Sequence, residues 1–350
     1  MSNTRSSAFT KGHKIVVFGA TGHTGRFVVA ELARRGLMAI LAARDPGKLL
    51  ALHKTYPSFE MRLASIDDPA SLDQALLGAS LVINSAGPFV DTAAPVIEAA
   101  LRARIHYLDV TAEQTVALAA FERFSDASRE AGVLTMPSVA FFGAFGDLLA
   151  TLAMRNWTEA DEIQIAVALD SWKPTLGTRL TGQRNPGWRL VFSNNRLSLL
   201  EHPPPKLEWA FPPRFGKQEV VALPLAETVI ISRHLRAPEI HAYMTLAPLV
   251  DLHNPTTPGP TAADERGRSA QEFVIEAKVR WGNEERRAIA AGRDIYAVTA
   301  PIVVEAAERI LAGDIQVSGT VAPGEVFDAE VFLGALSPEH ISLERADSPA

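Results

Sequence analysis

The sequence contains no cysteine at all. This absence excludes disulfide bonds, thiolate catalysis and cysteine-ligated metals, and it favours an intracellular, cytoplasmic protein. Residues 1–13 lack the apolar core that a secretory signal requires. The most apolar stretch, 139–154, is interrupted by Asp147 and by glycine. We therefore expect a buried helix or strand end there, and no stable insertion into a membrane.

Two catalytic patterns are also missing. None of the tyrosines is followed by a lysine four positions later, which excludes the mechanism in which such a lysine lowers the pKa of a catalytic tyrosine. The chain has no His-x-x-x-His or Glu-x-x-His pair, so we expect no catalytic metal. His234 and His241 are interpreted as solvated strand or loop residues. The formal net charge of −6 gives no indication of a nucleic-acid partner.

The 350 residues, 47% of them apolar, suffice for two domains. In the first half, short apolar strands alternate with helices, and this alternation predicts right-handed crossovers and a parallel, doubly wound sheet. The predicted strands are 14–18, 38–43, 59–65, 81–85, 106–110 and 133–139. The predicted helices are 26–35, 48–56, 69–77, 93–103 and 115–131, followed by one around 145–156.

The pattern changes at about residue 161. Alternating segments predict strands of a mostly antiparallel sheet at 163–169, 220–223, 228–232 and 273–281, separated by proline-rich loops at 202–213 and 253–267. A strong helix at 296–311 has an apolar face that we expect to pack on the first domain. We therefore expect a dinucleotide-binding Rossmann domain formed by 14–150 and 296–337, an inserted α+β domain at 151–295, and flexible ends at 1–13 and 338–350.

The sharpest local signal is the glycine loop GATGHTG, residues 19–25, directly after the first predicted strand. Gly19 permits a tight turn, Gly22 lets the backbone approach a pyrophosphate, and Gly25 lets the helix pack closely on the strand. The free N–H groups at the start of that helix would face the phosphates. A glycine loop between a strand and a helix indicates a dinucleotide site. The alternative is a structural turn that holds no cofactor.

The end of the second predicted strand bears on which dinucleotide is bound. An NAD site usually has an acidic residue there for the ribose diol, but this chain has Arg44, with Lys48 shortly after. Two cations near the 2′ position suit a 2′-phosphate and favour NADP. The alternative is a solvated basic patch in which Asp45 binds the ribose.

Two further loops follow strand ends in the same sheet. Asp67, after the third strand, is placed where it can reach the adenine, or it is the N-cap of the helix that starts at Pro69. The loop Ser85, Ala86, Gly87 and Pro88 follows the fourth strand and is expected near the nicotinamide ribose. The alternative for this loop is a plain Gly-Pro turn.

The acid/base candidates gather at the end of the fifth predicted strand. Alternation places Tyr107 and Asp109 on one face of that strand, and either can deliver a proton. We take these two as the catalytic candidates. The alternative is structural: Asp109 caps the following turn, and Glu113 belongs to a capping box opened at Thr111.

Four segments together, GATGHTGR, AARD, NSAGPF and HYLDVTAE, resemble the saccharopine dehydrogenase-like oxidoreductases, which are similar in their first domain to saccharopine reductases and trans-acting enoyl reductases. The resemblance covers about the first 150 residues. It implies NAD(P)H-dependent reduction, a Rossmann domain interrupted by a substrate domain, and often a homodimer. The cofactor contacts that it implies are Gly19, Thr21, Gly22, His23, Thr24, Arg44, Ser85, Gly87 and Pro88.

Two departures lie at the substrate edge of that pattern. Ala112 stands where the family commonly has glycine, and Phe145-Gly146-Asp147 lacks the proline that often precedes the aspartate. The substrate class therefore does not carry over. The leading hypothesis is an NADP-dependent reductase of a C=N or C=C bond in a small molecule, and the main alternative is a redox-inactive, NADP-binding regulatory protein.

Overall fold

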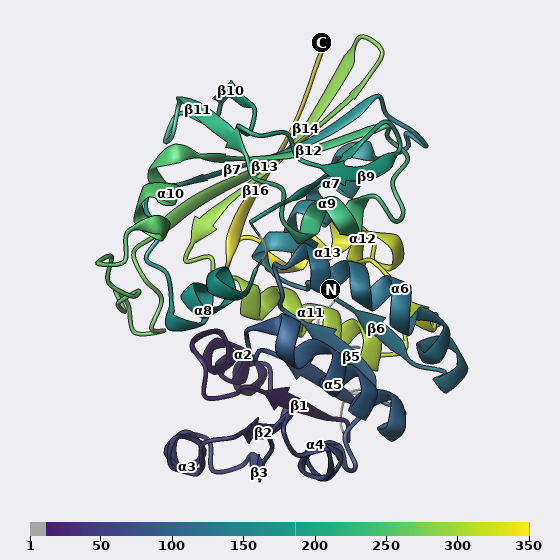
Figure 1. The fold of residues 1–350 in the computed structure, drawn as a ribbon, viewed down its shortest axis with the longest axis vertical. Helices are drawn as coiled ribbons and strands as arrows, with labels where there is room; N and C mark the ends of the chain where they lie inside the picture. Colours follow the sequence, from purple (N-terminus) through teal and green to yellow (C-terminus); the bar gives the residue numbers. More distant parts are fainter. Residues whose placement is uncertain (1–11, 186, 350) are drawn as a thin grey trace. The chain divides into compact units, whose positions relative to one another are not determined.

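The computed structural model describes residues 12–185 and 187–349, so most of the expected flexible N-terminus, 1–13, lies outside the described residues. The chain forms two compact units. Unit 1 comprises Met1–Ala140 and Thr299–Val321, and unit 2 comprises Phe141–Val298 and Ala322–Ala350. Both units are therefore built from two separate stretches of the chain (Figure 1).

Unit 1 contains a seven-stranded parallel sheet with the order β15-β6-β5-β4-β1-β2-β3. Its strands are β1 (Lys14–Phe18), β2 (Met38–Ala43), β3 (Glu60–Leu63), β4 (Leu81–Asn84), β5 (His106–Asp109), β6 (Leu134–Met136) and β15 (Gly319–Thr320). Its helices are α2 (His23–Arg34), α3 (Pro46–Thr55), α4 (Pro69–Leu76), α5 (Phe89–Ala103), α6 (Gln114–Ala131) and α11 (Thr299–Leu311). The predicted doubly wound sheet is confirmed.

Helices pack on the sheet of unit 1 through its alternating side chains. Val16 and Phe18 belong to an apolar cluster with residues of α4, α5 and α6. Helix α11 contacts α2, β4 and β5, and Figure 1 shows its yellow-green ribbon beside the purple α2. Arg35, just after α2, bonds to Glu31 at 2.7 Å, and its Nη1 reaches Glu308 of α11 at 2.9 Å. Burial of the apolar face and this ion-pair cluster hold α11 in the unit.

Unit 2 contains a nine-stranded sheet in which only β12 and β7 pair in parallel among the described residues. Its main path is β10-β11-β12-β7-β13-β14-β16, with β8 and β9 beside β12. The strands are β7 (Glu162–Leu169), β8 (Leu190–Ser193), β9 (Arg196–Leu199), β10 (Lys206–Ala210), β11 (Lys217–Ala222), β12 (Glu239–Thr245), β13 (Glu272–Trp281), β14 (Glu284–Arg293) and β16 (Ile341–Pro349). The predicted second, mostly antiparallel sheet is confirmed.

The helices of unit 2 explain why it includes residues that the sequence places in the first domain. They are α7 (Gly146–Met154), preceded by the segment η1 (Phe141–Phe145), whose backbone is not helical at Phe142 and Gly143, then α8 (Leu176–Arg184), α9 (Ala226–Ile231), α10 (Leu246–His253), α12 (Pro323–Val326) and α13 (Ala329–Leu336). Helix α7 packs on β13 and β14, and both α12 and α13 pack on α7. Three stretches expected in the first domain, residues 141–150, 296–298 and 322–337, therefore lie in unit 2 and not in unit 1.

Three local predictions are wrong. Residues 228–231 of the expected strand 228–232 lie in helix α9, whose residues are all buried, so the apolar run shows no periodicity that separates helix from strand. The expected loop 202–213 contains β10. The expected flexible tail contains β16, which pairs antiparallel with β14 along its whole length. Within the described part of the chain, no helix combines the length and apolarity needed to cross a membrane.

Candidate functional site

The glycine loop forms a tight turn between β1 and α2. Gly19 has a positive φ of 83°, and its N–H donates to the carbonyl of Ala42 at the end of β2, at 2.9 Å. The N–H of Gly22 donates back to the Gly19 carbonyl at 2.9 Å. Gly22 is the N-cap of α2 and has no side chain to occupy the first N–H groups of the helix. These groups are the donors that an anion at a helix N-terminus uses.

Side chains at the three glycines would collide with neighbouring backbone. A Cβ at Gly25 would lie 2.2 Å from the Gly19 oxygen, and one at Gly19 would lie 2.8 Å from the nitrogen of Ala86. At Gly22 the distance to the Gly19 oxygen would be 3.1 Å. The close approach of Gly19 to Ala86 also shows that the loops after β1 and β4 lie side by side. The tight turn expected at Gly19 and the close packing expected at Gly25 match this geometry, and the approach of a pyrophosphate to Gly22 stays a prediction.

The loop after β4 presents a buried hydroxyl without a partner. The N–H of Ser85 donates to the Phe18 carbonyl at 2.8 Å, whereas its Oγ is buried and bonds to no other described residue. Asn84 Oδ1 accepts from the N–H of Ala86 at 3.0 Å, and the Thr92 hydroxyl donates to the Ala86 carbonyl at 2.6 Å. A buried polar atom that lacks a partner calls for one from outside the protein, so Ser85 fits a bound cofactor.

The three charged residues after β2, namely Arg44, Asp45 and Lys48, make different contacts. Asp45 is the N-cap of α3, because its Oδ1 accepts from the N–H of Lys48 at 2.9 Å. Lys48 Nζ lies 3.8 Å from Asp45 Oδ2, and its side chain is 67% exposed. Arg44 is exposed and makes no hydrogen bond or ion pair with the described residues. The guanidinium of Arg44 is therefore available for a phosphate, while the Asp45 carboxylate is engaged by α3.

Asp67 is exposed and does not cap α4. Its Oδ2 accepts from the Ser65 hydroxyl at 3.3 Å. The N-cap is the next residue, Asp68, whose Oδ1 accepts from the N–H of Ser71 at 3.3 Å. The cap alternative for Asp67 is therefore wrong, and its contact with adenine stays a prediction.

Tyr107 and Asp109 form a buried hydrogen-bonded pair. The Tyr107 hydroxyl donates to Asp109 Oδ2 at 2.9 Å and accepts from Asn84 Nδ2 at 3.2 Å. Asp109 Oδ1 accepts from the N–H groups of Thr111 at 3.0 Å and Ser138 at 2.8 Å. Both Tyr107 and Asp109 are 0% exposed. The carboxylate thus connects the ends of β5 and β6, as the structural alternative requires, and a catalytic role for either residue stays a prediction.

Burial dominates the ionisation of this pair. It raises the pKa of Asp109 to about 6, although the hydrogen bonds from Ser138, Thr111 and Tyr107 act in the opposite direction. Burial, followed by the charge of Asp109, raises the pKa of Tyr107. A carboxyl group with a pKa near neutrality can gain or lose a proton under physiological conditions.

Glu113 has a role that the sequence does not reveal. Its carboxylate accepts from the N–H groups of Phe89 at 2.8 Å and Val90 at 3.2 Å, which are the first residues of α5. The capping-box alternative is wrong, because Glu113 is the N-cap position of α6 and its carboxylate reaches another helix. Burial raises the pKa of Glu113 to about 7 against these two hydrogen bonds. Glu113 and Asn84 together hold both ends of the loop 85–88.

In unit 2, the prediction that His234 is solvated is wrong. Its Nε2 lies 2.6 Å from Oδ1 of the fully buried Asp147, and its side chain is 8% exposed. Asp147 Oδ2 also accepts from the N–H of Gly324 at 2.6 Å. Burial lowers the pKa of His234, but the charge and hydrogen bond of Asp147 outweigh burial and raise it overall. His241 lies 3.1 Å from Glu239 and is partly buried.

Comparisons with known proteins assign the first unit. Residues 15–136 match the family model described as the saccharopine dehydrogenase NADP binding domain. The saccharopine dehydrogenase-like oxidoreductase of Bos taurus is 29% identical over 152 residues, which cover 38% of this chain and 35% of that protein. The trans-acting enoyl reductase of Mycobacterium ulcerans is 30% identical over 113 residues, covering 31% and 27%. The matched region thus spans about a third of these relatives.

One solved structure is similar over nearly the whole chain. The saccharopine dehydrogenase (L-Glu forming) of Saccharomyces cerevisiae aligns with a TM-score of 0.67, 13% identity, and coverage of 96% of this chain and all of that one. At this identity the similarity establishes the fold. The resemblance expected from the sequence and the NADP cofactor of unit 1 are confirmed by the family match.

Proposed function

We propose that this chain is an NADP-dependent oxidoreductase that reduces a C=N or C=C bond of a small molecule. The proposal is supported by the match of residues 15–136 to the saccharopine dehydrogenase NADP-binding domain family. The observation that carries the proposal is the approach of the glycine loop to the loop after β4. A Cβ at Gly19 would collide with the backbone of Ala86, and the buried Ser85 hydroxyl of the same loop bonds to no other described residue.

The residues of unit 1 would divide the binding of the cofactor among them. The backbone N–H groups at the start of α2, around Gly22 and His23, would hold the pyrophosphate. Arg44 would pair with the 2′-phosphate, and Ser85 would hydrogen-bond near the nicotinamide ribose. When bound, NADPH supplies the hydride for the reduction.

The protein's own contribution to chemistry is the fixed position of the loop 85–88. Asn84 holds Ala86, and Glu113 holds the start of α5 directly after the loop. We assign Asp109 a positioning role, because its two oxygens already accept three hydrogen bonds from Thr111, Ser138 and Tyr107. A substrate contact of Tyr107 or Asp109 requires the network to open.

The second candidate function is a redox-inactive, NADP-binding regulator. Its specific support is that both acid/base candidates, Tyr107 and Asp109, are fully buried and hydrogen-bonded to one another. Such a protein keeps the dinucleotide site and lacks a group that delivers a proton to a substrate.

The deciding experiment has two steps. Tight binding of NADPH to the purified chain, measured by calorimetry, is expected of both candidates and excludes a structural glycine turn. Oxidation of bound NADPH by a member of a panel of imines, ketones and enoyl esters is expected only of the enzyme. Lack of oxidation by the whole panel, with intact NADPH binding, would favour the regulator.

The cellular setting of the protein is part of the proposal. The lack of cysteine favours a cytoplasmic location, and the family resemblance favours a homodimer. Light scattering coupled to size-exclusion chromatography measures the second point, and a mass equal to a single 37.8 kDa chain would contradict it.

A further inference from the structure

We propose that unit 2 binds a small carboxylate in a pocket lined by Lys173, Ser269 and Thr261. The pocket has a volume of about 120 Å³. Its lining comes from the segment after β7, the segment that leads into β13, and Tyr296, all within unit 2. It shares no residue with the dinucleotide site, so the proposal does not depend on the proposed function.

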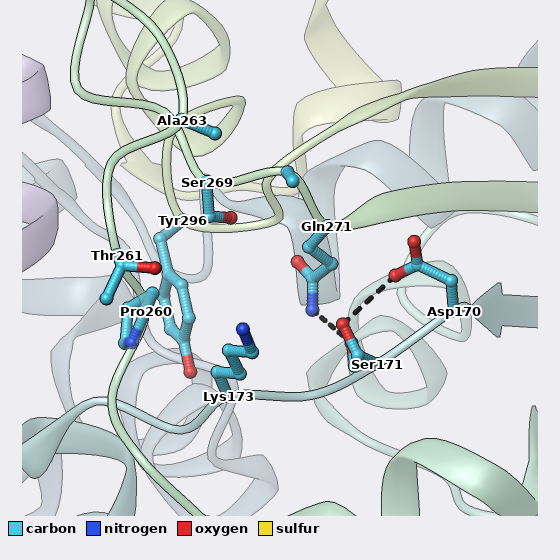
Figure 2. Close-up of a pocket in the computed structure, with 10 residues that line it drawn as sticks. Asp170, Ser171, Lys173, Pro260, Thr261, Ala263, Ser269, Gln271 and Tyr296 are labelled. Carbon is cyan, nitrogen blue, oxygen red and sulfur yellow. Dashed lines mark hydrogen bonds between the residues drawn. The ribbon is translucent and has the colours of Figure 1, made fainter.

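Lys173 is a cation that lacks a partner in the protein. Its ammonium group makes no ion pair or hydrogen bond with the residues that the structure describes. Figure 2 shows its side chain reaching up beside Tyr296, toward the space between that ring and Gln271. By contrast, each other lysine of unit 2 lies within ion-pair distance of a glutamate: Lys206 with Glu219, Lys217 with Glu208, and Lys278 with Glu285. Lys173 therefore offers its charge to a ligand.

Two hydroxyl groups add neutral donors to the same pocket. The backbone of Ser269 is fixed, because its N–H donates to Asp294 Oδ2 at 2.7 Å, and the residue is only 6% exposed. Its Oγ and the Oγ1 of Thr261 bond to none of the other described residues. An ammonium group and two hydroxyls that donate hydrogen bonds match the oxygen atoms of a carboxylate.

The rest of the wall is held in place by bonds of its own. The Tyr296 hydroxyl lies 3.0 Å from Nε1 of Trp172 and 2.8 Å from Oγ1 of Thr178. Gln271 Nε2 donates to the Ser171 carbonyl, and its Oε1 accepts from the N–H of Ile295 at 3.1 Å. These side chains shape the pocket before a ligand arrives, which lowers the entropic cost of binding.

Asp170 restricts the ligand further. Its Oδ1 accepts from the Ser171 hydroxyl and from the N–H of Glu272, both at 3.1 Å. Asp170 already places one carboxylate in the pocket. The carboxylate of a ligand is therefore acceptable there only if the ligand also carries a hydrogen-bond donor that faces Asp170. The site therefore suits a carboxylate that also carries a hydrogen-bond donor such as a hydroxyl, and it disfavours a bare anion such as sulfate.

The test uses the full chain, with ¹³C-labelled glycolate as the probe. Nuclear magnetic resonance of the labelled glycolate measures its binding. We expect saturable binding in the millimolar range, with weaker binding of acetate, which lacks the hydroxyl, and none of the neutral glycolamide. Lys173→Gln should weaken glycolate binding about tenfold or more, because it removes a charged hydrogen-bond donor. The exposed position of Lys173 allows the variant to fold.

Lys206→Gln is the matched control, since it removes a lysine from the same unit at an exposed position. It should leave glycolate binding unchanged, and Ser269→Ala should weaken it severalfold. Equal binding by Lys173→Gln and the unaltered protein would overturn the proposal, and so would equal binding of glycolamide and glycolate. Loss of NADPH binding with intact glycolate binding would contradict the proposed function alone.

A carboxylate in this pocket can be part of the substrate or a separate effector. Once a substrate of the reductase is known, glycolate should compete with it in the first case. In the second case, glycolate should change the turnover without competing. Both outcomes support the site and identify the source of its ligand.

Discussion

Replacement of Arg44 by alanine tests the choice of cofactor without any knowledge of the substrate. Arg44 follows β2 directly, is exposed, and is bonded to no other described residue. Its removal therefore breaks no hydrogen bond or ion pair with the described residues, and the stability of unit 1 should be unchanged. Any effect on NADPH then reports a contact with the cofactor itself.

The expected magnitude follows from the exposure of Arg44. A hydrogen bond to a charged group contributes roughly 1.5–3 kcal/mol, and solvent screening at an exposed site favours the lower end of that range. Since 1.4 kcal/mol corresponds to a factor of ten, Arg44→Ala should weaken NADPH about tenfold and leave NADH nearly unchanged. Lys48→Ala should have a smaller effect, because the Lys48 side chain is 67% exposed and its ammonium group already lies 3.8 Å from Asp45.

Calorimetric titration of the protein, Arg44→Ala and Lys48→Ala with both cofactors provides the measurement. The preference for NADPH should also shrink as salt is added, because the contact is screened. Equal affinity of the unaltered protein for NADH and NADPH would refute the reasoning. So would an equal loss for both cofactors in Arg44→Ala, since Asp45 or the backbone would then recognise the ribose.

Three further substitutions test other parts of unit 1. Gly25→Ala places a Cβ 2.2 Å from the Gly19 oxygen, so it should lower both the NADPH affinity, at least tenfold, and the melting temperature. The control is Gly47→Ala, whose Cβ would have no atom nearer than 3.4 Å and which should change neither quantity. Because the pKa of Glu113 is raised to about 7 in the folded protein, its contribution to stability is present below about pH 4.5 and is lost as pH rises through 7. Glu113→Gln should therefore remove a decline on the order of 2–3 kcal/mol between pH 5 and 8 in urea unfolding, and an unchanged slope would contradict the raised pKa. Asp109→Asn should lower turnover while NADPH affinity stays nearly constant, and full activity would remove Asp109 from the mechanism.

The elements predicted well are those whose apolar runs are bounded by clear breakers. The strand at 38–43 has its predicted bounds, because Gly36 precedes it and the charged Arg44 follows it. The glycine loop is predictable for a similar reason, because the residues on which its turn depends are neighbours in the sequence. Local chemistry of this kind is readable without knowledge of the fold.

The features that the sequence did not reveal depend on contacts between distant residues. Glu113 is bonded to Phe89, 24 positions earlier, and His234 to Asp147, 87 positions earlier. The strands β14 and β16 carry arginines and glutamates among small apolar residues, so their alternation is weak until the pairing between them is known. Only the folded chain brings these partners together.

The two-stretch construction of unit 1 also determines when its sheet can be completed during synthesis. Strand β6 ends at Met136, and its neighbour β15 begins at Gly319. At roughly 5–20 residues per second, a ribosome needs about 10–40 seconds to make the intervening segment. During that time the edge of β6 and the face of α2 that later contacts α11 have no native neighbour. The nascent chain is therefore expected to need protection from premature pairing while unit 2 is still being made.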